Sequence, residues 1–579
     1  MFAGTACIRL AGWLNDLRRV SHCTRMGPLP LLPSGPGGVG GIASRRTRHR
    51  FDDITAQRRI ERPQAFAAVD RIEGVNSLEI NAAPTIPGPQ VSRPRIGFVS
   101  LGCPKNLVDS EVMMGILSEA GATITADAET ADILVVNTCS FIDKAKQESV
   151  DTILEMARLK TGGRARRLVV AGCMVERYRD EIQKNIPEVD AVVGTGELEQ
   201  ILAAAGLTSP QSAFSSAATD SPFRILTIAE ASISHRAEGD HREAQGRFSR
   251  ESWDGAIASL PNYLYNEHTP RLRTTARSSA YVKIAEGCDH PCGFCIIPQI
   301  RGKFRSRRFE SVVAEVERLV SEGVQEVTLI GQDTTCYGED FGMKDGLAQL
   351  LDRLARIDGV RWLRFLYAYP NKVTPALLDT MARHENICKY LDVPLQHAAP
   401  NVLKRMKRGG GADIFLQMIE RARATMPEIA LRTSFIAGFP GETDADFDLL
   451  MDFVREARFD WLGVFEYSDE EGSAAFALDG KVPRRTIGTR QRKLMRNQLQ
   501  ISRKARAAQV GRSFDVLMEG ESEETPLLWQ GRAAMHAPEI DGKVLINDFG
   551  PYPAVLAGKF YRCEITDAHD YDLIARVVA

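Results

Sequence analysis

From Arg95 onward the sequence alternates between short apolar runs and longer amphipathic segments. The first three runs are "RIGFVSLGC", "ADILVVNTC" and "RRLVVAGC", with helical patterns such as "LVDSEVMMGILSEAG" between them. This alternation predicts a parallel sheet built from right-handed βαβ units. A chain of 579 residues also exceeds the ~250–300 residues at which one core stops growing, so we expect several domains.

Each of these three runs ends in a cysteine, namely Cys103, Cys139 and Cys173. The carboxyl ends of parallel strands lie at one edge of the sheet, where open α/β sheets bind ligands. The three thiols can therefore meet in space although they are far apart in the sequence. The alternative is that all three are ordinary buried cysteines.

A second alternation of strand-like and helical patterns begins near residue 281. Six strands suit an open, partial (β/α) barrel better than a complete eight-stranded one, and barrel active sites lie at the carboxyl ends of the strands. From residue 510 the runs are short and alternating, which predicts a small all-β barrel. The six strand-like runs of the second alternation, which precede residue 510, are "YVKIAEGC", "VQEVTLIGQD", "RWLRFLYAYP", "KYLDVPLQH", "ALRTSFIAGFP" and "WLGVFEYS".

The first of these strands leads into the loop "EGCDHPCGFCIIPQIRGKFRSR", which contains Cys288, Cys292 and Cys295. A structural zinc site needs four ligands, and here the fourth would have to be His290 or a distant residue. Three thiolates suit an iron–sulfur cube with one iron left open, because soft thiolates select such clusters. Structural zinc remains the alternative.

The C-x₃-C-x₂-C spacing, with Phe294 before the last cysteine, resembles the radical S-adenosylmethionine (SAM) superfamily. The resemblance implies a catalytic 4Fe–4S cluster on Cys288, Cys292 and Cys295, whose open iron binds SAM. An electron from the cluster then cleaves SAM to give a 5′-deoxyadenosyl radical. The sequence does not identify the electron donor.

Residues 95–579 as a whole resemble the methylthiotransferases, whose terminal β-barrel is called a TRAM domain. That family implies a second 4Fe–4S cluster, held by the cysteines at the ends of the first three strands. The strings "SLGCPKN" and "GQDTTCYG" resemble the branch that modifies the β-carbon of an aspartate in protein number twelve of the small ribosomal subunit. This branch uses two SAM molecules, one as methyl donor and one as radical source. The alternative is the branch that acts on isopentenyl-adenosine in tRNA.

Charge gives a separate test of the branch. Residues 510–579 contain twelve acidic and six basic residues, a local charge of −6. An RNA-grasping domain should be basic, whereas an acidic one suits a basic ribosomal protein. The alternative is a merely solvated acidic surface. We therefore expect direct nucleic-acid binding to be secondary, although the basic segment 489–506 could touch RNA.

Further SAM contacts are expected near the carboxyl ends of the barrel strands. "TSFIAGFPGET" resembles the adenine-side motif of the superfamily, and its glycines allow close backbone approach to a ligand. Ordinary hydrogen bonding at the barrel rim is the alternative for each polar residue. The basic residues from Arg301 to Arg308 are expected to be mostly solvated, with one or two functional. The predicted SAM-contacting residues are Phe294, Gln332, Gln396, Ile436 and Gly438.

Residues 1–94 are rich in Arg, Pro and Gly, which predicts a disordered extension, a transit peptide or a misassigned start. Eleven cysteines scattered over a long chain favour a reducing compartment, and no apolar run reaches the length of a membrane span, so we expect a cytoplasmic protein. A third hypothesis is a non-catalytic zinc-bearing RNA-binding module. The predicted divisions are 95–205 for the amino-terminal domain, 206–275 for a linker or insertion, 276–506 for the radical SAM domain and 507–579 for the TRAM domain.

Overall fold

A computed structural model describes residues 93–207, 260–522 and 525–579 of the protein. The extension predicted for 1–94 lies outside the described residues except for its last two positions. Most of the linker predicted for 206–275 also lies outside them. Residues 260–275 are described, and within them Tyr265 and Arg271 are buried. No helix among the described residues is both long and apolar enough to cross a membrane.

The amino-terminal domain is a five-stranded parallel sheet in the order β2-β1-β3-β4-β5. The central strand β3 is buried along its whole length, as expected for a parallel sheet covered on both faces. The strands are β1 (Arg95–Ser100), β2 (Thr123–Thr125), β3 (Ile133–Thr138), β4 (Arg167–Gly172) and β5 (Ala191–Val193). The helices are α2 (Pro104–Glu119), α3 (Asp143–Gly162), α4 (Cys173–Asn185) and α5 (Ile201–Ala205). The predicted three strands are present, and two short strands are added to them.

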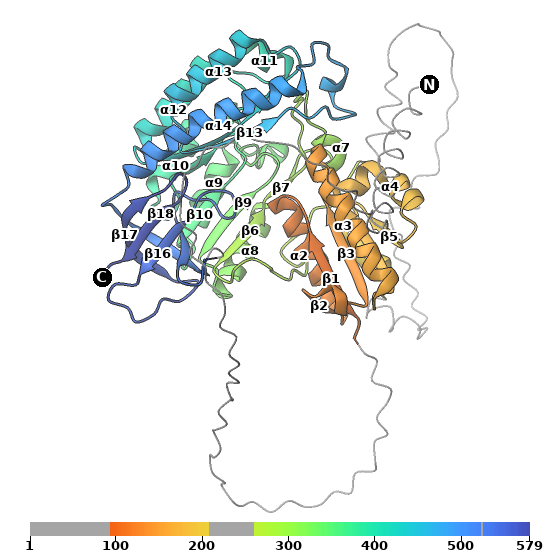
Figure 1. The fold of residues 1–579 in the computed structure, drawn as a ribbon. Coiled ribbons are helices and arrows are strands. Elements are labelled where there is room, and N and C mark those ends of the chain that lie inside the picture. Colours follow the sequence, from red (N-terminus) through yellow and green to blue (C-terminus); the bar gives the residue numbers. More distant parts are fainter. Residues whose placement is uncertain (1–92, 208–259, 523–524) are drawn as a thin grey trace, which may run out of the picture. The chain divides into compact units, whose positions relative to one another are not determined.

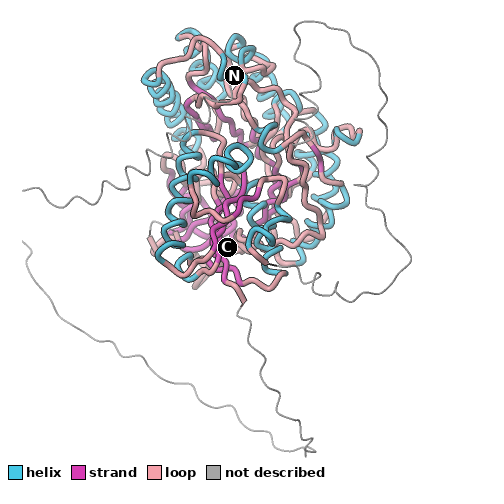
Figure 2. The backbone as a smooth tube through the Cα atoms, turned by 90° about the vertical axis from the view of Figure 1, so that its right-hand side faces the viewer, coloured by secondary structure: helices cyan, strands magenta, loops and turns pink. Residues whose placement is uncertain are grey.

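The second domain is the predicted open barrel of six parallel strands. It consists of two three-stranded sheets, β6-β9-β10 and β11-β12-β13, which an isolated bridge between Leu363 and Ile387 connects. Figures 1 and 2 show helices on the outside of these strands. The strands are β6 (Ser279–Lys283), β9 (Glu326–Ile330), β10 (Trp362–Phe365), β11 (Tyr390–Asp392), β12 (Ala430–Ala437) and β13 (Trp461–Glu466).

Two of the helices that follow these strands, α10 and α13, begin after a threonine whose side chain caps the helix. Helix α13, for example, begins with a capping box in which Thr443 and Asp446 bond each other's backbone N–H through their side chains. The helices are α8 (Phe309–Ser321), α9 (Gly346–Leu354), α10 (Pro375–Arg383), α11 (Pro400–Arg405), α12 (Ala412–Thr425), α13 (Asp444–Ala457) and α14 (Arg484–Ala507). Two short strands, β7 (Ala285–Glu286) and β8 (Arg305–Ser306), pair with each other. The short helix α7 (Ile297–Arg301) lies between them in the sequence.

The carboxy-terminal domain is a closed five-stranded barrel, as predicted, in the order β14-β15-β16-β18-β17. It packs against the residues that begin the larger barrel's strands. Trp362 at the start of β10 stacks edge-to-face on Phe560, and Tyr390 at the start of β11 donates a hydrogen bond to Asp541. The small barrel therefore covers the end of the strands opposite to the cysteine loops. Its strands are β14 (Ser513–Glu521), β15 (Trp529–Ala533), β16 (Val544–Asp548), β17 (Phe560–Ala568) and β18 (Leu573–Val577).

A buried carboxylate at this junction gives a pH-dependent prediction. The Glu326 side chain is fully buried and forms ion pairs with Arg532 (2.6 Å) and Arg364 (3.4 Å). Burial alone would raise the pKa of Glu326, but the two guanidinium groups lower it to about 2 from its ordinary 4.5. Because the folded-state pKa is lowered, the stabilisation is present above pH 4.5 and is lost as the pH falls towards 2. E326Q should therefore lower the free energy of unfolding by about 3 kcal/mol at pH 7.

Urea unfolding of the wild type and E326Q should show this difference shrinking as the pH falls below about 4.5. The matched control is E339Q, since Glu339 pairs with Lys372 at the surface and should contribute about 0–1 kcal/mol. A difference between the wild type and E326Q that stays constant from pH 7 to the acid limit would contradict the assignment.

Candidate functional site

The first three strand ends bring Cys103, Cys139 and Cys173 to one edge of the amino-terminal sheet. Cys103 is the residue that caps α2, Cys139 directly follows β3, and Cys173 is the first residue of α4. A side-chain carbon at Gly102 would lie 3.3 Å from the Cys139 sulfur, so the glycine lets these two loops approach closely. All three thiols are free.

Buried hydrogen bonds connect the three cysteine loops to each other. The Asn137 side chain donates to the carbonyl of Asn106 (2.9 Å), which links the second loop to the first. The Ser140 hydroxyl donates to the carbonyl of Cys173 (3.0 Å), which links the second loop to the third. The Leu101 N–H adds a backbone bond to the Asn137 carbonyl (2.9 Å). The positions of the three cysteines are therefore fixed by the sheet and by its loops together.

The three thiols have different electrostatic surroundings. Burial alone would raise the pKa of Cys103, but the positive charges of Lys105 and Arg301 hold it below its ordinary value. Burial raises the pKa of Cys139 and raises that of Cys173 to about 12, and in both cases the neighbouring thiols add to the rise.

The second triad lies in the loop between β7 and α7. The Cys295 N–H donates to the Cys292 carbonyl (3.1 Å), and the Gly293 N–H donates to the Met406 carbonyl at the end of α11 (2.8 Å). The Arg408 guanidinium donates to the Cys292 sulfur at 3.4 Å. Burial raises the pKa of Cys288 to about 11 and that of Cys295 to about 12, and the nearby thiols again contribute.

Gly287 allows the two ends of this loop to meet. Its φ is +79°, and a side-chain carbon there would lie 2.1 Å from the Lys303 carbonyl oxygen. G287A should therefore suffer both the left-handed backbone cost of about 1–2 kcal/mol and a backbone clash, and, if the Cys288 triad holds iron as expected from the sequence, should lose it. The measurement is iron content after anaerobic purification.

G323A is the matched control for G287A. Gly323 also has a positive φ of +98°, but a side-chain carbon there meets nothing within 4 Å. The control suffers the backbone cost alone and should keep its full iron content. Full iron in G287A would mean that the loop can open without disturbing its cysteines.

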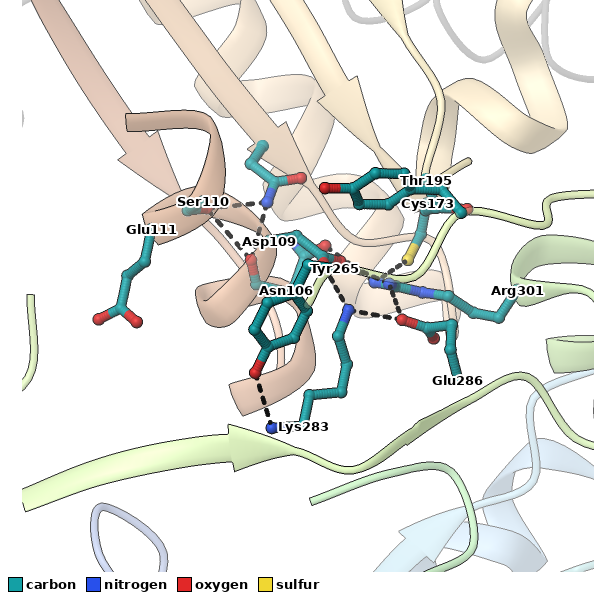
Figure 3. Close-up of polar contacts among 12 residues, drawn as sticks. Asn106, Asp109, Ser110, Glu111, Cys173, Thr195, Tyr265, Lys283, Glu286 and Arg301 are labelled. Carbon is teal, nitrogen blue, oxygen red and sulfur yellow. Dashed lines mark hydrogen bonds and ion pairs between the residues drawn. The ribbon is translucent and has the colours of Figure 1, made fainter. Parts of the chain in front are cut away.

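A buried ion-pair network joins the amino-terminal domain to the barrel domain beside Cys173 (Figure 3). Lys283 at the end of β6 forms ion pairs with Asp109 of α2 and with Glu286, the latter at 2.5 Å. Arg301 at the end of α7 also pairs with Asp109 (2.5 Å) and lies 3.5 Å from Glu286. The Gln332 side chain donates to Glu286 (2.6 Å) and so connects the network to the loop after β9. Two cations and two carboxylates balance each other here.

The predicted SAM-contacting residues lie at the carboxyl ends of the barrel strands. The Gln332 side-chain oxygen is buried and has no hydrogen-bond partner. Gln396 has a φ of +73°, and its backbone pairs with Ser434 and Ile436 of β12. Phe294 and Ile436 are half-buried against the barrel core. A side-chain carbon at Gly438 would lie 2.3 Å from Ile487, so the glycine lets Ile487 pack closely there, and its contact with SAM stays a prediction.

Asp333 gathers three donors beside the Cys288 loop. Its carboxylate is 2.6 Å from a ring nitrogen of His290, and it accepts from the Cys336 thiol (3.1 Å) and from Thr335. The His290 ring stacks on Tyr369 with 3.8 Å between centroids. These contacts hold the Cys288 loop against the loop that follows β9.

Sequence reasoning missed the charged groups that touch the thiols. The stretch from Arg301 to Arg308 was expected to be mostly solvated with one or two functional residues; Lys303 and Arg308 are exposed, whereas Arg301 and Arg307 are each 2% exposed, and the sequence did not indicate which two would be buried. Their partners Asp109 and Glu315 lie far away in the sequence or on another element, so no local pattern identifies them. Lys105 is the exception, because its position two residues after Cys103 is a local signal.

Three family models match separate segments of the chain. Uncharacterized protein family UPF0004 matches residues 95–194, the Radical SAM superfamily matches 282–454, and the TRAM domain matches 510–578. Among solved structures, the radical S-adenosylmethionine methyltransferase TsrM from Kitasatospora setae has a TM-score of 0.42 at 16% identity, covering 65% of this chain and 72% of its own.

Two curated relatives are similar over almost their whole length. The ribosomal protein uS12 methylthiotransferase RimO of Koribacter versatilis is 66% identical over 500 residues, covering 85% of this chain and 98% of its own. The enzyme of the same name from Solibacter usitatus is 55% identical over 488 residues, covering 84% and 95%. The predicted family is confirmed: the chain belongs to the RimO family of methylthiotransferases, within the radical SAM superfamily.

Proposed function

We propose that this protein methylthiolates the β-carbon of an aspartate in ribosomal protein uS12. The observation that carries the proposal is the pair of cysteine triads, one on each α/β domain, with a buried ion-pair network between them. Sulfur insertion at an unactivated carbon needs a cofactor-derived radical, because no side chain breaks such a C–H bond. The names of the relatives support uS12 as the substrate and disfavour the tRNA alternative.

The residues present fit two 4Fe–4S clusters. Each triad offers three free thiols, the soft ligands that such clusters require, and leaves one iron open for another ligand. Cys288, Cys292 and Cys295 would hold one cluster, and Cys103, Cys139 and Cys173 the other. When bound, the clusters and two molecules of SAM supply the radical that removes hydrogen from the substrate and the methylated sulfur that replaces it.

The chain itself binds and orients these groups. The unpartnered, buried oxygen of Gln332 fits a polar ligand at the barrel rim, while its amide is held by Glu286. Phe294 and Ile436 would supply apolar contacts to SAM, and the Gln396 side chain would supply polar ones. The buried barrel behind them excludes water from the reacting groups.

The TRAM barrel is proposed as a docking surface for a basic protein. Its net charge of −6 favours a basic ribosomal protein over RNA, although the basic segment 489–506 lies beside it in the sequence. Its packing against the amino ends of the barrel strands, at Trp362 and Tyr390, supports a role away from the cysteine loops. Because ribosomes are the site of the substrate, we assign the reaction to the cytoplasm.

The proposed divisions of the chain follow the same evidence. The family matches to 95–194, 282–454 and 510–578 support domains at 95–205, 276–506 and 507–579. Arg271 forms ion pairs with Glu111 of α2 and with Glu315 of α8, so 260–275 is proposed to be a joint between the first two domains.

Gene deletion followed by mass spectrometry tests the function. Peptides of uS12 from the deleted strain should lack the methylthio group, and the cloned gene should restore it. The C292A variant, which keeps the fold but removes one cluster ligand, should fail to restore it. Loss of a methylthio group from tRNA nucleosides, with uS12 unchanged, would assign the protein to the other branch.

A further inference from the structure

One arginine of the radical SAM domain reaches a cysteine of the other triad. Arg301 ends α7, the short helix that directly follows Cys295, and its guanidinium donates to the Cys173 sulfur at 3.4 Å (Figure 3). Ile296 and Ile300 from the same segment pack against Cys173. The segment that follows Cys295 of the second triad therefore covers Cys173 of the first triad.

The Arg301 guanidinium is held in place by the amino-terminal domain. One of its nitrogens pairs with Asp109 (2.5 Å), and the other donates to the Asn106 side chain (3.1 Å) as well as to Cys173. The Thr195 hydroxyl also donates to the Ile300 carbonyl (2.7 Å), which fixes the helix that carries Arg301. With both a charge partner and a backbone anchor, the guanidinium has little freedom to leave the sulfur.

The charges of the network are balanced before any cluster is counted. Lys283 and Arg301 offset Asp109 and Glu286, all of them buried. An oxidised four-iron cube held by three thiolates carries about one net negative charge, and reduction adds another. A fixed guanidinium beside one thiolate favours the more negative, reduced state, because hydrogen bonds to the sulfurs and nearby charge tune cluster potentials.

We propose that Arg301 is a positioning residue for the cluster on Cys103, Cys139 and Cys173, and that it raises the reduction potential of that cluster. The inference rests on the proposed function, since it requires a cluster at this triad. Because Arg301 belongs to α7 of the radical SAM domain, it can reach Cys173 only when the two domains are packed together. The Cys173 cluster is therefore fully shaped only in the assembled protein.

The test uses a parent that carries only this cluster, the variant C288A/C292A/C295A. Its potential is measured by an anaerobic redox titration followed by visible absorption and by electron paramagnetic resonance. R301Q should lower the midpoint potential of the parent. R301K keeps the positive charge beside Asp109 but loses the guanidinium group that donates to both Asp109 and Cys173. It should therefore lower the midpoint potential by a smaller amount. It should also remain folded if R301Q does not.

R408Q in the same parent is the matched control. Arg408 donates to Cys292 at the same 3.4 Å distance, and that cysteine is absent from the parent. The control should therefore leave the potential unchanged. A potential in R301K and R301Q equal to that of the parent, or an equal shift in R408Q, would overturn the role of Arg301. A parent that binds no iron would instead refute the cluster at this triad and the proposed function.

Discussion

Replacing Cys103, Cys139 and Cys173 together with alanine should abolish methylthiolation but leave the reductive cleavage of SAM intact. The reason is that the proposed ligands of the other cluster, Cys288, Cys292 and Cys295, all lie in one loop of the other domain, so that cluster should survive the change. Iron should fall from about eight to about four atoms per chain if each triad holds one cubane. The three measurements are iron content, release of 5′-deoxyadenosine and the methylthio group on a uS12 peptide.

The matched control replaces Cys388 and Cys563 with alanine. Both are buried thiols without a place in either triad, and Cys563 belongs to the TRAM barrel. Iron content and product should stay at the wild-type level, apart from a modest loss of stability. A triple variant that keeps all its iron, or one that still forms product, would refute the second cluster.

Sequence patterns predicted the parts of the fold that have long, continuous signals. The strand before Cys139 is a fully buried apolar run, and the cysteine at its end identifies the functional edge of the sheet. The short edge strands β2 and β5 were missed, because three residues cannot establish a period. Register and closure of the six-stranded barrel depend on pairings between distant segments, which no local window contains.

The residues of the candidate site also fall into those that the sequence could indicate and those that it could not. The sequence could single out the six cysteines, three by their close spacing in one loop and three by their positions at strand ends, and their role as cluster ligands stays a prediction. The groups that hold them were not: Arg301 resembles its solvated neighbour Lys303 in sequence, and only the docking of α2 brings Asp109 to it. Gly438 has a packing role that the sequence did not indicate, because it makes room for Ile487 of α14, and its contact with SAM stays a prediction.

The joint around Arg271 should be a large contributor to stability. Its side chain is 1% exposed and pairs with Glu111 (2.6 Å) and Glu315 (2.8 Å), both fully buried. Breaking a buried pair by removing one partner leaves an uncompensated charge and costs about 3–5 kcal/mol. R271M, which keeps much of the volume, should therefore lower the urea midpoint strongly. R356M is the surface control, because Arg356 is 63% exposed in its pair with Asp352 and should contribute at most about 1 kcal/mol.

A second variant separates lost charge from lost packing at this joint. In R271M/E111Q the buried carboxylate of Glu111 is replaced by a neutral amide, which can still accept hydrogen bonds from the N–H and hydroxyl of Thr274. Glu315 keeps its ion pair with Arg307 in both variants. If the unpaired charge dominates, the double variant should be more stable than R271M alone. If instead the two are equally unstable, the guanidinium acts through packing and its bond to the Tyr281 carbonyl, and the electrostatic account of the domain joint is wrong.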